Sequence, residues 1–159
     1  MANIRGPVAS LLLVLNFCMY VVLLSIGGWA MNRAIDEGFI IGQGLKLPAR
    51  FSPISFPFGN AATGFFVTFS MIAGVVGVAS AIAGISHILG GNSETQAAAS
   101  AAAASAATIA WTLTALAMGF AWKEIRLNIR NSKLKTMEAF TIILTFTQLA
   151  YILAIYLKK

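Results

Sequence analysis

Four long apolar runs limit what this chain can fold into more than any other feature. They cover about residues 8–31, 61–89, 97–122 and 139–157. A helix of about 20 residues crosses the hydrocarbon core of a bilayer, and lipid offers no partner for unpaired backbone groups. The runs therefore predict an all-α fold, a four-helix transmembrane bundle, in which residues 1–159 form a single four-span membrane domain.

The composition agrees with a membrane protein. Hydrophobic residues make up 58% of the chain and charged residues 10%, whereas soluble domains carry about 25% charged residues. The net charge of +6 would suggest a nucleic-acid partner in a soluble protein. Here the basic residues stand at the ends of the apolar runs and in the segments that connect them, where they set topology and attract anionic headgroups. We therefore predict the lipid bilayer and anionic lipid headgroups as partners, and no nucleic acid.

The first apolar run is interpreted as a retained span. An apolar stretch after Arg5 resembles a signal peptide, but this run exceeds the signal core of about 7–15 residues. Pro7 suits the first position of a helix, and Gly38 is expected to end that helix. The helix would then project beyond the membrane and carry Arg33.

A Pro/Phe-rich loop is predicted between spans 1 and 2, over residues 39–60. Its three prolines exclude a helix through most of this segment. Its aromatic residues alternate with Lys46 and Arg50. An extended backbone cannot lie in hydrocarbon, so we expect the loop to pack on the mouth of the bundle or to lie at the lipid interface.

Small residues mark the second and third spans. Span 2 repeats them at the i, i+4 spacing that lets helices approach closely in lipid: Ser70–Gly74, Ala73–Gly77–Ala81 and Ser80–Gly84. The first half of span 3 is nearly all alanine and serine, so we expect this half to face protein rather than lipid.

Residues 123–138 form a predicted basic hairpin, with Thr136 as the N-cap of span 4 and Glu138 in its first turn. Lys123, Arg130, Lys133 and Lys135 are assigned to lipid headgroups. Recognition of an anionic solute is the alternative, and Arg126, Arg130 and Lys133 would share a face if the segment were one helix. Counting Lys and Arg, the side of residues 32–60 and 123–138 has eight and the other side three. These two loops are therefore predicted to be cytoplasmic.

Signals for chemistry are weak. Cys18 is the single cysteine and His87 the single histidine, so we predict no metal site, no cofactor, no catalytic residue and no enzymatic activity. No charged residue falls near the middle of a span, which argues against an ion pump. The deep polar residues Asn16 and Gln148 are neutral. They either join helices by hydrogen bonds or line a solute path.

Several segments together resemble one plant family. They are GWAMNRAID at 28–36, FSPISFPFGNAATGFF at 51–66, IAGVVG at 72–77, KEI at 123–125 and QLAYILAI at 148–155. The chain resembles the AWPM-like family, the abscisic-acid-induced wheat plasma-membrane polypeptides. The resemblance implies a four-span protein of the plant plasma membrane that accumulates with abscisic acid, drought, cold or seed dormancy. It also implies transport, because facilitated uptake of abscisic acid is assigned to a family member.

Two functional hypotheses follow. The first is a facilitator of abscisic acid uptake in stress and dormancy responses, in which Arg33 and Arg126 guide the anion and Asn16 and Gln148 meet its polar groups. Four helices make a tight path, so a homo-oligomer is expected. The second is a structural protein, induced by dehydration and cold, that stabilises the membrane or organises partners. An open polar crevice between Asn16 and Gln148 would favour the first, and a closed bundle there the second.

Overall fold

The computed structural model describes residues 5–38, 61–89, 93–127 and 131–156. They form four helices: α1 (Arg5–Gly38), α2 (Ala61–Leu89), α3 (Ser93–Leu127) and α4 (Ser132–Tyr156). Each helix is long and apolar enough to cross a membrane. The predicted all-α, four-helix fold is confirmed, and Gly38 is the last residue of α1 as expected. The Pro/Phe-rich loop, with Lys46 and Arg50, lies outside the described residues.

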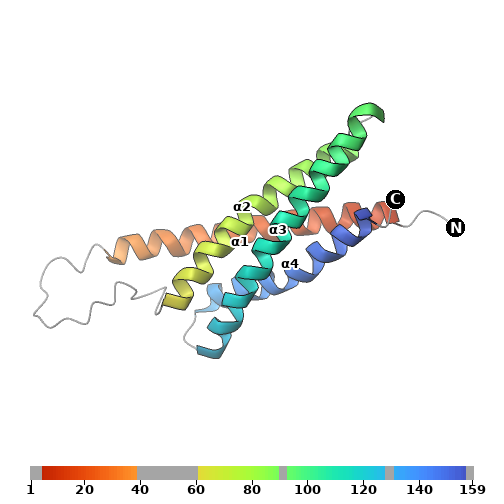
Figure 1. The fold of residues 1–159 in the computed structure, drawn as a ribbon. Coiled ribbons are helices and arrows are strands. Elements are labelled where there is room, and N and C mark those ends of the chain that lie inside the picture. The colour runs from red at the N-terminus through yellow and green to blue at the C-terminus, as the bar shows by residue number, and fades with distance from the viewer. Residues whose placement is uncertain (1–4, 39–60, 90–92, 128–130, 157–159) are drawn as a thin grey trace, which may run out of the picture.

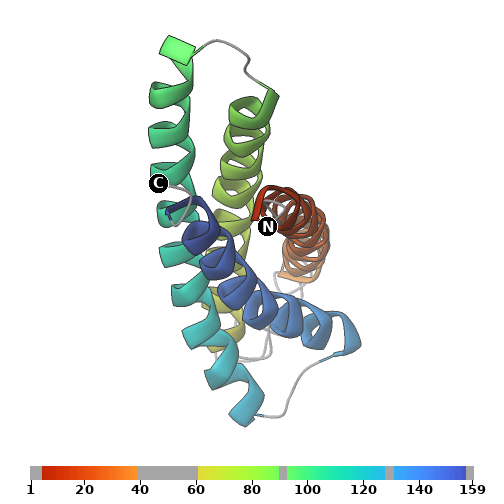
Figure 2. The ribbon, with the colours of Figure 1, turned by 90° about the vertical axis from the view of Figure 1, so that its right-hand side faces the viewer.

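The four helices form a closed ring of neighbours. Helix α1 contacts α2, α2 contacts α3, α3 contacts α4, and α4 returns to α1. Figures 1 and 2 show α2 and α3 side by side along most of their length. The same views show these two helices diverging from α1 and α4 toward residues 90–92. Apolar side chains that face away from the ring stay exposed, as a lipid-facing surface requires.

Glycines set the close contact between α1 and α2. A methyl group added at Gly77 would lie 2.5 Å from ring carbons of Tyr20, and one added at Gly74 would lie 2.8 Å from Leu24. Real side chains do not approach that closely, so only glycine fits at these two positions without a shift of the neighbour. The predicted small-residue packing face of span 2 is thereby confirmed at Gly74 and Gly77.

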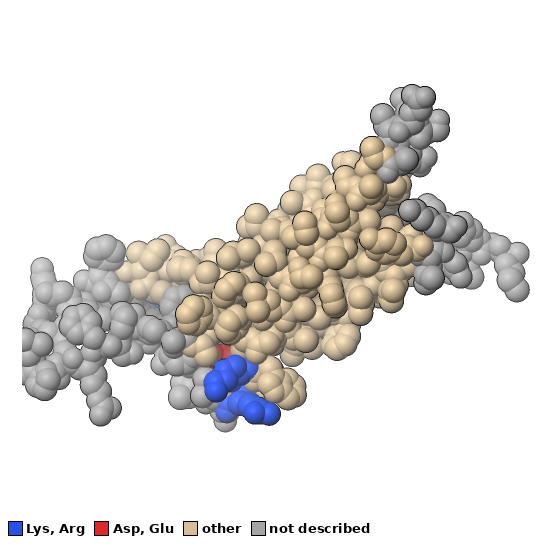
Figure 3. All heavy atoms as spheres, in the orientation of Figure 1, with Lys and Arg blue, Asp and Glu red and all other residues tan. Residues whose placement is uncertain are grey.

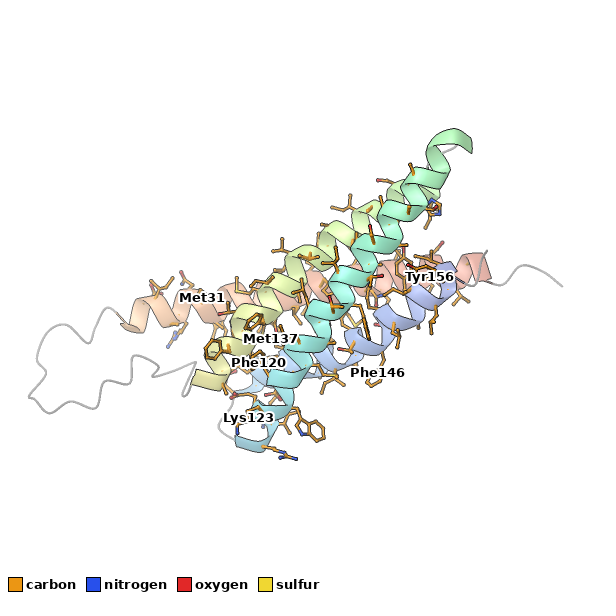
Figure 4. All side chains as sticks on the ribbon, viewed as in Figure 1. Met31, Phe120, Lys123, Met137, Phe146 and Tyr156 are labelled. Carbon is orange, nitrogen blue, oxygen red and sulfur yellow. The ribbon has the colours of Figure 1, made fainter. Side chains whose placement is uncertain are left out.

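Two buried clusters fill the ring. One includes Tyr20, Phe66 and Leu144 and lies toward the end where α3 finishes and α4 begins. The other includes Leu13, Ala107 and Tyr151 and lies toward the opposite end. In Figure 4, Phe120, Lys123 and Met137 lie toward the first end and Tyr156 toward the second. Burial of apolar side chains between helices thus continues through the whole bundle.

The prediction for the start of the fourth helix is wrong. We placed the N-cap at Thr136, whereas α4 begins at Ser132. The side-chain oxygen of Asn131 accepts hydrogen bonds from the backbone of Lys133 at 2.9 Å and of Leu134 at 3.2 Å. Asn131 therefore caps the helix, because an Asn oxygen can satisfy the free N–H groups of a first turn. Glu138 consequently lies in the second turn and not in the first.

The structure also contradicts our alternative in which the basic segment of residues 123–138 is one helix. Helix α3 ends at Leu127 and α4 begins at Ser132, so Arg126 and Lys133 belong to two helices and do not share one helical face. Arg130 lies outside the described residues.

The expectation for the alanine-rich half of span 3 holds for one face only. Ala103 and Ala107 are buried, whereas Ala101 and Ala102 are exposed.

Candidate functional site

The structure brings Asn16 and Gln148 into direct contact. The Asn16 amide Nδ2 donates to Gln148 Oε1 at 2.8 Å. Gln148 Nε2 in turn donates to the backbone oxygen of Ala107 at 3.4 Å. Asn16 and Gln148 are 1% and 2% exposed, so the two amides close the interior of the bundle where they meet. This polar layer ties α1, α4 and α3 together.

A second polar contact lies one helical turn further along α1. Tyr20 and Thr114 hydroxyls are 2.9 Å apart, and Thr114 donates to the backbone oxygen of Ala110 at 2.7 Å. Because the Thr114 proton points to Ala110, the Tyr20 hydroxyl donates to Thr114 Oγ1. The contact joins α1 to α3 across the ring. Sequence reasoning missed this pair, although a tyrosine four residues after Asn16 in an apolar run was a usable signal.

Some interior polar atoms keep unused hydrogen-bonding capacity. Asn16 Oδ1, Ser70 Oγ and Ser80 Oγ are buried and have no hydrogen-bond partner within the part of the chain that the structure describes. A buried polar atom without a partner costs about 1–3 kcal/mol. Each of these atoms can therefore gain free energy by bonding a polar group of a bound molecule.

A buried carboxylate lies at the end of the bundle where the basic residues gather. Thr63 Oγ1 of α2 donates to Glu124 Oε1 of α3 at 2.6 Å, and Glu124 is fully buried. Glu138 of α4 is 3% exposed. Sequence reasoning gave Glu124 no role and placed Glu138 at a helix start. One signal was available in the sequence: residues 123–138 contain two acidic residues, Glu124 and Glu138, beside five basic ones.

Replacing Thr63 by valine is expected to lower the free energy of unfolding by about 0.5–1.5 kcal/mol, the usual net contribution of one hydrogen bond. The change keeps the shape of the side chain but removes the donor to the buried Glu124 carboxyl group. Thermal unfolding of purified protein in detergent measures the loss. The Thr63→Ser variant keeps the hydroxyl and serves as the control. Equal losses in both variants would contradict the role of the hydrogen bond.

Two cations of this end lie against tryptophans. Lys133 Nζ is 4.0 Å from the ring centre of Trp29, which joins α4 to α1 by a cation–π contact. The Arg126 guanidinium lies 5.9 Å from the ring centre of Trp122 in the same helix. Lys133 thus has a contact within the protein beside its predicted lipid-binding role. Trp122 and Arg126 are exposed, as residues of an interfacial aromatic belt would be.

The charged surface is confined to this end on the face that Figure 3 shows. Its blue Lys and Arg atoms gather where α3 finishes, and the described surface along the rest of the bundle is uncharged. Lys123 and Lys135 are exposed, as headgroup binding would require. Arg33 and Arg126 are both exposed, but Figures 1 and 2 show the C-terminal ends of α1 and α3 apart. The two proposed guide residues therefore do not form one cluster.

Four membrane-length helices hold neutral polar side chains at the middle of the bundle, and the described charged side chains, with the buried Glu124 and Glu138 among them, lie at one end. These features define a small polytopic helical membrane protein. The chain belongs to the AWPM-19-like family, whose model matches residues 14–158. It is similar to "Membrane protein PM19L" from Oryza sativa subsp. japonica, with 38% identity over 153 residues that cover 96% of this chain and 79% of the rice protein. No solved structure matches the chain.

Proposed function

We propose that this membrane protein facilitates the uptake of abscisic acid across the plant plasma membrane during stress and dormancy. The family resemblance supports the choice of solute. The observation that supports a transport role is the set of neutral polar side chains at the middle of the bundle, in which buried atoms such as Asn16 Oδ1 keep unused hydrogen-bonding capacity. Abscisic acid carries hydroxyl, keto and carboxyl groups that can bond to such atoms.

The proposed route begins at the basic end of the bundle. Arg33 and Arg126 attract the carboxylate from separate positions, because a cation lowers the cost of bringing an anion to the membrane. The Asn16–Gln148 bond, at 2.8 Å, closes the interior further along. A solute that passes inside one protomer must therefore separate these two amides and replace their hydrogen bond with its own. The flow is passive and downhill, and no catalytic step is involved.

Uptake into liposomes tests this proposal. Purified protein in liposomes is expected to give saturable uptake of labelled abscisic acid, faster than empty liposomes of the same lipid. Arg126→Ala and Arg33→Ala are each expected to reduce the initial rate severalfold at low solute concentration, because steering by a charge acts mainly on encounter. Lys135→Ala removes a nearby exposed cation and is the control.

The outcomes separate the parts of the proposal. Uptake that falls in either arginine variant, but not in Lys135→Ala, supports the guide residues. Saturable uptake that is unchanged in both arginine variants keeps the facilitator and removes Arg33 and Arg126 as guides. A rate no faster than in empty liposomes removes the transport role.

A structural role is the second candidate, and the closed Asn16–Gln148 contact favours it. In this role the chain stabilises the membrane or organises partners during dehydration and cold. The glycine contacts of α1 and α2 make a rigid bundle, and Lys123, Lys135 and Arg130 bind anionic headgroups. A homo-oligomer would extend such a bundle in the plane of the membrane.

Orientation is part of both proposals. The segments 32–60 and 123–138 carry most of the basic residues and are proposed to face the cytoplasm. The buried Glu124 and the Lys133–Trp29 contact then lie near the inner leaflet.

A further inference from the structure

A tyrosine of α4 reaches across the bundle to α2. Tyr151 is 2% exposed and belongs to the buried cluster that includes Leu13, at the end of the bundle away from Lys123. A methyl group added at Gly84 of α2 would overlap the Tyr151 hydroxyl oxygen and would lie 2.9 Å from Leu13 of α1. Three helices therefore meet at Gly84, and the hydroxyl occupies space that any larger residue at this position would fill.

The Tyr151 hydroxyl is not used inside the bundle. No hydrogen bond joins it to a residue that the structure describes, whereas the Tyr20 hydroxyl bonds Thr114 at 2.9 Å. A buried phenol usually has a partner, because a polar group that leaves water without one costs free energy. Phenylalanine would fill the same space against Gly84 without that cost. The hydroxyl is therefore available to a bound molecule.

His87 lies on the same face of α2 as Gly84. Residues three apart on a helix are neighbours, with their Cβ atoms about 5–6 Å apart. His87 therefore stands beside the position that the Tyr151 hydroxyl occupies. The histidine is half-buried, and its Nδ1 atom is buried with no hydrogen-bond partner among the described residues. A phenol and an imidazole, each with an unused hydrogen-bonding atom, thus lie around Gly84.

These two side chains suit a carboxyl group. A phenol donates through its hydroxyl, and an imidazole donates from Nδ1 in one of its two neutral tautomers and also when it is protonated. A carboxylate accepts both bonds through its two oxygens, and a hydrogen bond to an ionised group is about twice as strong as one between neutral groups. Leu13, Ile85 and Ile152 of the same cluster supply apolar surface for the rest of a largely hydrocarbon solute.

From this arrangement we infer that Tyr151 and His87 bind the carboxyl group of the transported solute at the end of the bundle opposite Arg126. The inference rests on the proposed uptake role, which supplies abscisic acid as the solute. In the proposed orientation this end faces the outside of the cell. The anion then has a hydrogen-bonding site on one side of the Asn16–Gln148 pair and the arginine guides on the other.

Removal of the unused hydroxyl tests the site without a transport measurement. Tyr151→Phe keeps the ring against Gly84, so the melting temperature of the purified protein is expected to stay unchanged or to rise, because no hydrogen bond of the protein is lost. The same variant is expected to bind abscisic acid about tenfold more weakly in a calorimetric titration. Tyr20→Phe is the matched control. It removes a hydroxyl that bonds Thr114, so it is expected to lower the melting temperature and to leave binding unchanged.

Two further measurements separate the carboxyl contacts from other effects. His87→Leu is expected to weaken binding of abscisic acid to a similar extent, because it removes the second donor. The methyl ester of abscisic acid carries no ionised group. Its binding is therefore expected to fall less in Tyr151→Phe than binding of the acid does.

Three results would overturn the site. They are no binding of the acid to the wild-type protein, binding that is unchanged in both Tyr151→Phe and His87→Leu, and an equal loss of binding in Tyr20→Phe. A Tyr151→Phe melting temperature that falls together with binding would assign the hydroxyl to the fold and would also overturn the site. Weakened binding as expected, with no uptake into liposomes by the wild-type protein, would reject the uptake role alone. Uptake by the wild-type protein, with binding unaffected by the changes, would reject the site alone.

Discussion

Gly77→Ala is expected to destabilise the bundle by about 1–3 kcal/mol, the usual range for overpacking a close contact. The added methyl group would lie 2.5 Å from ring carbons of Tyr20. The ring cannot move aside cheaply, because Tyr20 is fully buried and its hydroxyl bonds Thr114 at 2.9 Å. Thermal unfolding in one detergent, compared with the wild-type protein, measures the loss.

Gly64→Ala is the matched control on the same helix. A methyl group at Gly64 meets nothing within 4 Å. Alanine is the better helix former by about 0.8–1 kcal/mol, so this variant is expected to be as stable as the wild-type protein or more stable. If Gly77→Ala proved as stable as Gly64→Ala, the close α1–α2 contact would not be a source of stability. A Tyr20→Val change should reduce the harm of Gly77→Ala, because it removes the ring that the methyl group meets.

The Asn16–Gln148 pair gives the second large effect. Asn16→Leu and Gln148→Leu are each expected to cost about 1–2 kcal/mol, because each leaves the other amide buried with its bond lost. The double variant replaces both amides with apolar groups and is expected to cost less than the sum of the single changes. A double-mutant cycle from thermal unfolding measures this coupling. Strict additivity would mean that the 2.8 Å bond contributes nothing specific.

The same double variant separates the two proposed functions. It keeps a packed and stable bundle but removes two polar members of the interior layer. A facilitator would then lose most of its uptake while its melting temperature stayed near that of the wild-type protein. A structural protein would keep its ability to protect vesicles against leakage after drying. Uptake and protection measured on one preparation therefore distinguish the two roles.

The fold could be predicted from the sequence because lipid imposes one strong rule. Backbone groups must be paired inside each span, so a long apolar run is nearly always a helix. The small residues of span 2 likewise indicated the contacts that Gly74 and Gly77 make. Such signals are local, since they need only the residues of one segment.

The site was predicted less well because it depends on how helices lie against one another. Asn16 and Gln148 could be singled out as deep polar residues, but their contact depends on the register of α1 against α4. Ser80 resembled any other small residue of span 2, and Tyr20 resembled any apolar one. The burial of Glu124 and Glu138 was not predicted, because composition does not reveal which face of a helix points inward. The cap at Asn131 was missed because Thr136 offers the same chemistry nearer the apolar run.

The alanine-rich half of α3 bears on how the protein enters the membrane. This helix has the lowest mean hydropathy of the four, and alanine gains little by leaving water for lipid. Its partition into the bilayer as a lone segment is therefore the weakest of the four spans. Helix α2 is more hydrophobic, precedes α3 in the chain and contacts it closely. During biogenesis, α2 and α3 would thus enter the bilayer together as a helical hairpin, in which the earlier span helps to retain the later one.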